Sequence, residues 1–162
     1  LSNGEGSAYV IPGTDIMLNN MLGEEDLAPA GFHHWPVDTR LGSMMAPTIA
    51  QASSGALIAL GTGGANRIRS AILQVMLNLL VFRMSVADAV AAPRLHGEGD
   101  EIAIEPGYAE GAVAALTAAF PQTRRWASQS MFFGGVHAAR RQRDGSVEGI
   151  GDDRRGGAVA FG

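Results

Sequence analysis

The residues of this chain that could most readily do chemistry form a short glycine-rich segment, Gly61-Thr62-Gly63-Gly64-Ala65-Asn66. An apolar run at residues 55–60 precedes it, and a long apolar pattern at residues 66–82 follows it. Glycines let the backbone turn sharply and let a ligand approach, and the first N–H groups of a helix have no partner within the helix. The segment therefore predicts an anion or oxyanion site built mostly from backbone. A plain turn between a strand and a helix is the alternative that the segment alone leaves open.

Other kinds of site fit the sequence less well. No Lys-Ser or Lys-Thr follows Gly64, so the segment is not a P-loop. Asn66 stands where a dinucleotide-binding fingerprint has its third Gly or Ala, and a nucleotide-binding module therefore stays a minor hypothesis. No Gly-x-Ser-x-Gly element is present. The histidines lack the spacing of a helical metal site, and the pair His33-His34 is interpreted as a surface or interface feature.

Composition narrows the function classes further. With 162 residues, 46% of them hydrophobic, the chain is long enough for one domain with a sizeable core. A net charge of −4 argues against a nucleic-acid partner. The lack of cysteine excludes disulfides, cysteine zinc sites and a cysteine nucleophile. The sequence shows no transmembrane segment and no signal peptide at Leu1, and because no Met stands there we expect it to be the later part of a longer protein.

The elements that must position the glycine segment follow from periodicity. Residues 66–82 place apolar side chains at the spacing of a buried helical face, with Asn66 as the expected N-cap. Further helices are expected from Ser85 to just before Pro93 and at residues 110–120. Short strands are expected at residues 8–11, 16–18, 48–51, 55–60, 101–105, 132–139, 147–150 and 156–161. This order favours an α+β layered fold, with residues 1–162 as a single domain.

Five motifs occur in a fixed order along the chain. They are Ile16-Met17-Leu18-Asn19-Asn20, Arg40-Leu41-Gly42-Ser43-Met44-Met45-Ala46-Pro47-Thr48-Ile49, the glycine segment with Arg67-Ile68, Asp88-Ala89-Val90-Ala91-Ala92-Pro93-Arg94-Leu95-His96, and Asp153-Arg154-Arg155-Gly156-Gly157-Ala158. Together they resemble the small subunit of the γ-glutamyltranspeptidases, which are N-terminal-nucleophile hydrolases. The resemblance covers essentially the whole chain, and it implies the small-subunit part of a four-layer αββα sandwich.

The resemblance also implies a reaction. In the family, a precursor cleaves itself, and the new N-terminal Thr of the small subunit attacks a γ-glutamyl amide with its own α-amine as the base. The acyl-enzyme then passes the acyl group to water or to an amino acid. The position of this Thr lies about twenty residues before Leu1, so we expect no nucleophile in this chain, and Thr14 is interpreted as a turn residue. No metal ion and no organic cofactor is implied.

The glycine segment corresponds to the oxyanion hole of the family. Alignment through Arg67-Ile68 places the donors on Gly64 and Ala65, whereas alignment through the glycines places them on Gly63 and Gly64. Each of these residues keeps a backbone N–H, whichever side chain it carries. The resemblance therefore makes Gly63, Gly64 and Ala65 the candidate oxyanion donors.

Three side chains correspond to substrate-binding residues of the family. Asn3 and Glu24 match positions near the α-amino end of the substrate, and Ser43 matches one of two serines at its α-carboxylate. Met21 stands where the family has Gln or Glu, and Gly42 replaces the other serine. Because these departures lie in the pocket that reads the glutamyl head group, they affect γ-glutamyl specificity more than acyl transfer.

The resemblance thus predicts γ-glutamyl transfer or hydrolysis on glutathione or another γ-glutamyl amide. An acylase for a glutaryl-type amide, as in the cephalosporin acylases of the family, and a non-catalytic homologue are the alternatives. The implied partner is a large subunit from the same precursor, in an assembly that can extend to a dimer of heterodimers. Loop residues 28–39 are the candidate interface with that subunit. A periplasmic or secreted location is implied by the family alone.

Overall fold

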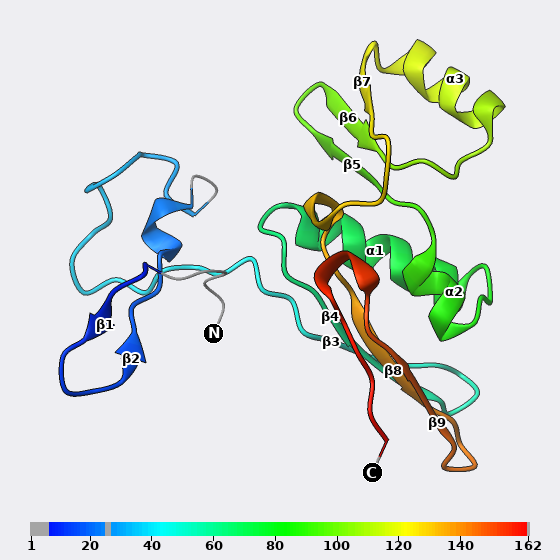
Figure 1. Cartoon of the computed structure of the whole chain (residues 1–162), viewed down its shortest axis with the longest axis horizontal. Helices are drawn as coiled ribbons and strands as arrows, with labels where there is room; N and C mark the ends of the chain where they lie inside the picture. Colours follow the sequence, from blue (N-terminus) through cyan, green and yellow to red (C-terminus); the bar gives the residue numbers. More distant parts are fainter. Residues whose placement is uncertain (1–6, 25–26, 162) are drawn as a thin grey trace. The chain divides into compact units, whose positions relative to one another are not determined.

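The computed structural model describes residues 7–24 and 27–161 of the chain. The chain divides into two compact units, Leu1–Met45 and Ala46–Gly162 (Figure 1). The prediction that the whole chain forms a single domain stays a prediction. Within the described residues, every helix is too short or too polar to cross a membrane.

The first unit contains little regular structure. Strands β1 (Val10–Ile11) and β2 (Ile16–Met17) form a small antiparallel hairpin, and the 3-10 helix η1 (Met21–Gly23) follows it. The hairpin is exposed or half-buried along both strands, whereas Met21 in η1 is only 6% exposed. Few buried apolar contacts therefore hold the hairpin, and most of this unit is loop.

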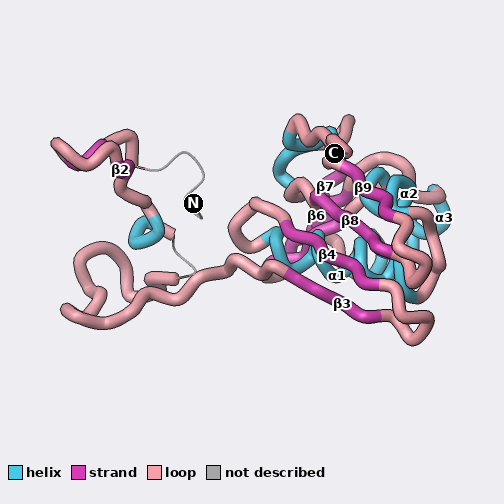
Figure 2. Tube along the Cα trace, turned by 90° about the horizontal axis from the view of Figure 1, so that it is seen from below, coloured by secondary structure: helices cyan, strands magenta, loops and turns pink. Residues whose placement is uncertain are grey.

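The second unit is centred on a four-stranded antiparallel sheet in the order β3-β4-β8-β9 (Figure 2). Its strands are β3 (Thr48–Gln51), β4 (Leu57–Gly61), β8 (His137–Arg141) and β9 (Val147–Ile150). Gly61 at the end of β4 pairs with His137 at the start of β8. This register places the glycine segment beside the chain that leads into β8.

Two helices, α1 (Arg67–Leu80) and α2 (Val86–Ala91), cover one face of this sheet (Figure 1). The apolar residues of α1 recur at helical spacing, so that one stripe of the helix meets the inward side chains of β4. Each fully buried Val or Leu in such a contact stabilises the fold by about 1.5–3 kcal/mol. The buried core cluster consists of Ile58, Leu60, Ala71, Val75, Leu79, Val86, Ala89, Val90, Val136 and Ala138.

Part of the opposite face of the same sheet is exposed, and the C-terminal segment lies against this face at Gly149, where a Cβ atom would be 3.2 Å from the Val159 Cγ2 atom. Successive strand residues point to opposite faces, so the neighbours of Ile58 and Leu60 point away from the helices. Ile49 on β3 is 79% exposed, and its strand partner Ala59 and the next residue across, Ala139, are also exposed. The part of this face around Ile49 therefore exposes small and branched apolar side chains.

A second, three-stranded sheet in the order β5-β6-β7 completes the unit. Its strands are β5 (Leu95–Glu98), β6 (Glu101–Ile104) and β7 (Gln122–Arg125). Helix α3 (Glu110–Ala119) connects β6 to the parallel strand β7, since a parallel pair needs a crossover connection. Pro121 lies two residues after the last residue of α3 and prevents the helix from continuing.

The structure confirms the α+β class and most of the expected elements, with three errors. Strands β5 and β7 were not expected from the sequence. The strand expected at residues 132–139 is wrong over its first half, because residues Met131–Phe133 form the 3-10 helix η2 and Gly134 turns the chain with φ +78°. The strand expected at residues 156–161 is also wrong, since those residues follow the turn η3 (Asp153–Arg155) without pairing in a sheet.

Candidate functional site

The glycine loop, residues 61–66, joins the end of β4 to the start of α1. Two of its residues have positive φ angles, +134° at Gly64 and +49° at Ala65. The first of these angles is accessible almost only to glycine. A Cβ atom on Gly64 would also lie 3.2 Å from the Gly134 Cα atom. The loop conformation therefore depends on glycine at this position.

The loop uses its carbonyl groups and leaves its N–H groups unpaired. The Gly64 carbonyl accepts from the Arg67 N–H at 3.0 Å, and the Ala65 carbonyl accepts from the Ile68 N–H at 3.1 Å. Within the described residues, the N–H groups of Gly63, Gly64 and Ala65 donate to no other group of the chain. Because they lie at the positive end of the α1 dipole, these donors favour an anion.

Thr62 ties the glycine loop to the segment that precedes β8. Its hydroxyl donates to the Gly63 carbonyl at 2.8 Å and accepts from the Gly135 N–H at 2.8 Å. A Cβ atom on Gly134 would lie 2.9 Å from the Thr62 Oγ1 atom. Two glycine-containing segments, distant in sequence, thus pack against each other with no side chains between their backbones.

The Arg155 side chain lies against the same loop. Its Nη1 atom would be 3.5 Å from a Cβ atom on Gly63, and its Nη2 atom 3.6 Å from one on Gly64. A Cβ atom on Gly135 would be 2.6 Å from the Arg155 Cδ atom, so only glycine there leaves room for this side chain. Its Nη2 atom donates to the Met131 carbonyl at 3.3 Å, and no carboxylate among the described residues pairs with it. A full positive charge therefore stands beside the unpaired N–H groups.

Asn66, at the end of the loop, does not cap α1, and the expectation that it would is wrong. Its backbone is already helical, with φ −55° and ψ −31°, and its side chain makes no hydrogen bond to the helix start. Its Nδ2 atom instead donates to the Glu98 Oε1 atom on β5. Glu98 is 32 residues further along the chain, so this partner gave no local signal in the sequence.

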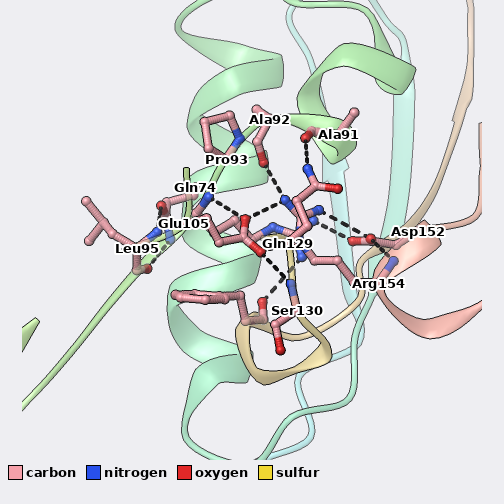
Figure 3. Close-up of polar contacts among 12 residues, drawn as sticks. Gln74, Ala91, Ala92, Pro93, Leu95, Glu105, Gln129, Ser130, Asp152 and Arg154 are labelled. Atoms are coloured by element: carbon pink, nitrogen blue, oxygen red, sulfur yellow. Dashed lines mark hydrogen bonds and ion pairs between the residues drawn. The ribbon is translucent and has the colours of Figure 1, made fainter. Parts of the chain in front are cut away.

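A buried four-charge network, formed by Arg94, Glu105, Asp152 and Arg154, lies next to this region (Figure 3). The Arg94 Nη2 atom lies 2.6 Å from the Asp152 Oδ2 atom, and the Arg154 Nη2 atom lies 2.6 Å from the Glu105 Oε2 atom. Arg154 also contacts Asp152 at 3.3 Å, and so links both carboxylates. Two charges of each sign cancel within the protein interior.

Backbone groups satisfy much of the remaining hydrogen-bonding capacity of the network. The Glu105 carboxylate accepts from the N–H groups of Arg94 at 2.9 Å and Ser130 at 3.1 Å. The two guanidinium groups donate to the Val90 carbonyl, at 2.9 Å from Arg94 and 3.0 Å from Arg154. The Asp152 Oδ2 atom accepts from the N–H of Val136, just before β8, at 2.8 Å. The network thus connects α2, the end of β6, the segment before β8 and the segment after β9.

The pKa values in the network follow from burial and from the neighbouring charges. Burial, and then repulsion from Arg154, lowers the pKa of Arg94. Burial alone would lower the pKa of Arg154, but its hydrogen bond to Glu105 and the charge of that group raise it. Burial alone would raise the pKa of Asp152, but the Arg94 charge and the Arg154 N–H lower it. These directions keep the Asp152 carboxyl ionised and the Arg154 guanidinium protonated.

The substrate-binding candidates belong to the first unit. Glu24 lines a pocket of about 290 Å³ together with Gly23 and Phe32. The exposed Ser43 hydroxyl accepts from the Met45 N–H at 3.2 Å. Asn3 lies outside the described residues. The roles of these three residues in binding stay predictions.

Thr14 is a turn residue in the hairpin of the first unit. Its hydroxyl donates to the Ile11 carbonyl at 2.8 Å and accepts from the Ile16 N–H at 3.2 Å. Its own N–H donates to the Ile11 carbonyl at 3.2 Å. Both its hydroxyl and its N–H are therefore engaged in closing the turn, as the sequence interpretation expected.

Comparison with known proteins agrees with this geometry. Residues 1–162 match the sequence profile of the family described as Gamma-glutamyltranspeptidase. The Acylase ACY 1 proenzyme of Pseudomonas sp. (strain SE83) is 33% identical over 144 residues, which are 89% of this chain and 25% of that protein. The Glutathione hydrolase proenzyme of Bacillus subtilis (strain 168) is 24% identical over 156 residues, or 95% of this chain and 26% of that protein. This chain thus spans about a quarter of the length of these curated relatives.

A solved structure gives the same result for the fold. The crystal structure of a mutant γ-glutamyltranspeptidase from Helicobacter pylori matches with a TM-score of 0.76 at 27% identity, covering 92% of this chain and 87% of that chain. The fold is therefore that of the N-terminal-nucleophile hydrolases. The chain belongs to the γ-glutamyltranspeptidase family, whose members are transferases and hydrolases.

Sequence reasoning located the glycine loop but not the side chains that hold it. Arg94 and Arg154 stood in two of the family motifs without a role, and Glu105 carried no signal beyond the end of an expected strand. Arg155 stood in the last of these motifs, also without a role. A charged residue inside an apolar pattern, as at Arg94 after Pro93, is the signal that could have indicated a buried ion pair.

Proposed function

We propose that this chain supplies the oxyanion hole of an amide-cleaving enzyme whose nucleophile is an N-terminal Thr located before Leu1. The observation that carries the proposal is the glycine loop, where the N–H groups of Gly63, Gly64 and Ala65 have no partner among the described residues. Buried or half-buried donors are normally paired, so a cluster of unpaired ones indicates a ligand position. In the family pattern this ligand is the oxygen of a tetrahedral intermediate.

The proposed reaction follows from these donors and from the family pattern. The Thr hydroxyl attacks the amide carbonyl carbon, and its α-amine takes up the hydroxyl proton. The carbonyl oxygen becomes an oxyanion, which the loop N–H groups stabilise as its charge develops. The C–N bond then breaks, the amine leaves with the proton, and an ester to Thr remains. Water or an acceptor amine attacks this ester and releases the acyl group.

Arg155 adds electrostatic support at this position. Its guanidinium lies against Gly63 and Gly64 and has no carboxylate partner in the described part of the chain. A guanidinium can pair with a substrate carboxylate through two hydrogen bonds or stabilise a nearby oxyanion by its charge. The first role favours a substrate that carries a carboxylate, as both γ-glutamyl and glutaryl amides do.

The leading substrate class is a γ-glutamyl amide such as glutathione. Glu24 supports it, since this carboxylate can pair with the α-ammonium group of a glutamyl substrate. The candidate donors and acceptors for that head group are Asn3, Glu24 and Ser43.

A glutaryl-type amide is the second candidate, and two observations favour it. Met21 is buried, 6% exposed, and carries no polar group for an ammonium, and Gly42 lacks the hydroxyl that the family has there. In addition, the relative named as an acylase is 33% identical, whereas the Bacillus subtilis glutathione hydrolase is 24% identical. A glutaryl group differs from a γ-glutamyl group by lacking the ammonium that these positions would bind.

The proposed partner is a large subunit from the same precursor. Both relatives compared above are named proenzymes. The exposed part of the sheet face around Ile49, Ala59 and Ala139 is apolar, which suits a second sheet packed against it. Such a contact would supply the other two layers of the four-layer sandwich. The dimer of heterodimers remains a further proposal for the assembled enzyme.

A rate comparison on the processed enzyme tests the proposal. The protein is expressed as the proenzyme, and the N-terminus of the small subunit is sequenced. We expect Thr there, and turnover of γ-glutamyl p-nitroanilide faster than of glutaryl p-nitroanilide. Equal or faster turnover of the glutaryl compound would assign the enzyme to the acylases. Turnover of neither compound, or an N-terminus without Thr, Ser or Cys, would overturn the catalytic proposal.

A further inference from the structure

A chain of side chains links the glycine loop to the buried side of α1. The Ser70 Oγ atom on α1 lies 2.7 Å from the His96 Nδ1 atom on β5, and the His96 Nε2 atom lies 3.3 Å from the Glu98 Oε2 atom. The other carboxylate oxygen of Glu98 accepts from the Asn66 side chain. Four residues from two elements thus form one continuous hydrogen-bonded path that ends at the loop.

The direction of each hydrogen bond in this path follows from the chemistry of its members. An ionised carboxylate only accepts, so the His96 Nε2 atom must carry a proton and donate to Glu98. In the neutral imidazole the Nδ1 atom then accepts, and the Ser70 hydroxyl donates to it. The pKa of Glu98 is lowered, chiefly by the hydrogen bond from Asn66, which keeps the carboxylate ionised. The hydrogen bond between His96 and the ionised Glu98 therefore runs from His96 to Glu98, whereas the direction of the one between Ser70 and His96 depends on the second ring proton.

His96 is the rigid centre of this path. Its residue is 4% exposed, and the Phe132 ring packs edge-on against it at a centroid distance of 6.1 Å. Gln74 ties the same two elements a turn further along α1, by accepting from the Leu95 N–H at 3.0 Å and donating to the Leu95 carbonyl at 2.8 Å. The β5 end of the path is thus held in a fixed position relative to α1.

Asn66 connects this fixed part of the path to the glycine loop. It directly follows Ala65, one of the candidate oxyanion donors, and directly precedes the first residue of α1. Its side chain binds Glu98 and leaves the helix start uncapped. The hydrogen bond from Asn66 to Glu98 on β5 therefore helps to orient the peptide planes of the loop, in addition to α1.

We infer that Glu98 and His96 are positioning residues for the oxyanion hole, acting through Asn66. Oxyanion donors must lie about 2.7–3.1 Å from the developing charge, and a displacement of about 1 Å can cost about 100-fold in rate. The catalytic consequence rests on the proposed function, whereas the mechanical one, a loop held by Glu98, does not. Loss of the path should lower kcat and leave KM nearly unchanged, because the head-group contacts of the substrate lie elsewhere in the family pattern.

The test compares three variants of the processed enzyme. Glu98→Ala removes the acceptor for Asn66 and His96, and since the Glu98 side chain is 52% exposed, it opens no cavity in the core. Glu98→Gln is the conservative variant, because its amide oxygen can still accept from Asn66. Glu101→Ala is the matched control. Glu101 pairs with Glu98 across β5 and β6 and lines the same pocket of about 480 Å³, but makes no hydrogen bond to the loop in the described residues.

Two readouts keep the inference separate from the proposed function. In Glu98→Ala we expect kcat to fall about tenfold with KM within about twofold, and Glu98→Gln and Glu101→Ala to stay within about twofold of the parent. We also expect faster hydrogen exchange of the peptide that contains the Arg67 and Ile68 amides, in Glu98→Ala alone. If Glu98→Ala matches Glu101→Ala in exchange and in kcat, the inference is wrong. If the parent enzyme cleaves neither anilide, the proposed function fails, and exchange alone decides whether Glu98 holds the loop.

Discussion

Two neighbouring regions of the second unit treat their polar groups in opposite ways. In the four-charge network, Arg94, Glu105, Asp152 and Arg154 are almost fully buried and paired at distances down to 2.6 Å. In the glycine loop, residues 63–65 leave their N–H groups without partners in the described chain. The network gains its hydrogen bonds from four different segments, whereas the loop is held only through its carbonyls and through Thr62 and Asn66.

The contrast indicates that the four-charge network stabilises the fold, whereas the glycine loop keeps its donors available for a ligand. A buried charge is costly to desolvate, so a network of four is tolerated only when each charge has a partner of opposite sign, and that pairing fixes the segments that carry it. A buried N–H donor without a partner costs about 1–3 kcal/mol unless a ligand uses it. The loop can keep its donors free because the network holds Val136 and the segment before β8, against which the loop packs.

The largest effect should come from breaking the network. Arg154→Met leaves both carboxylates with one guanidinium between them, and we expect it to lower the unfolding free energy of the processed enzyme by about 3–5 kcal/mol. Thermal and urea unfolding measure this change. Arg125→Met, which breaks the exposed pair with Glu110, is the control and should leave stability unchanged. Similar losses of unfolding free energy in both variants would mean that the buried network does not stabilise the fold.

The next effect should come from the loop itself. Gly64→Ala forces a Cβ atom into a backbone conformation with φ +134° and against Gly134, so the N–H groups must turn. We expect kcat to fall by about 100-fold or more, as for loss of an oxyanion donor. Ala65→Gly, at φ +49°, suits the local backbone and should keep kcat within about twofold. Retained activity in Gly64→Ala would indicate that the loop is a plain strand-to-helix turn without a role in catalysis.

A smaller effect is expected from Arg155, whose guanidinium lies beside the loop. Arg155→Met keeps much of the packing on Gly135 but removes the charge, and it should lower kcat/KM for an anilide that carries a carboxylate by about tenfold, the value of one charge-assisted hydrogen bond. Steady-state kinetics with the two anilides measure this. Arg143→Met is the control, since that side chain packs on Gly55 at the far hairpin. Equal rates for the parent and Arg155→Met would exclude Arg155 from substrate binding.

The smallest effect is a pH dependence of stability. The folded-state pKa of Asp152 lies below its ordinary value of 3.8, despite burial, because of Arg94 and the Arg154 N–H. A lowered pKa means that the stabilisation is complete above about pH 4 and is lost as the pH falls through the folded-state value. The melting temperature of the parent should therefore fall more steeply between about pH 4 and 3 than that of Asp152→Asn. Equal slopes of melting temperature against pH in the parent and in Asp152→Asn would contradict the assignment of this pH dependence to Asp152.

Local sequence patterns predicted those elements whose burial is visible in a short window. The apolar spacing of α1 and the hairpin of β3 and β4 are of this kind, and the structure confirms both. Strands β5 and β7 are different. β7 reads Gln122-Thr123-Arg124-Arg125, with no apolar alternation, and it is a strand because it pairs with β6. Such pairing depends on residues far along the chain, which no local window contains.

The same limit applies to the site. Glycine content identified the loop and its candidate donors, since backbone chemistry is visible in composition. The partner of Asn66 could not be predicted, because Glu98 competes successfully with the helix start from a different strand. The position of the Arg155 side chain could not be predicted either, because it depends on the absence of a side chain at Gly135. The departures at Met21 and Gly42 remain the residues on which the substrate prediction depends.

The exposed part of the sheet face around Ile49 has a practical consequence for handling this chain. Strand β3 is an outer strand of the sheet, and Ile49 on it is 79% exposed. An open strand edge beside an apolar surface is a template for pairing with another copy, and so a site of aggregation. Expressed by itself, the chain should accumulate in inclusion bodies, and the substitution Ile49→Lys should increase the soluble fraction.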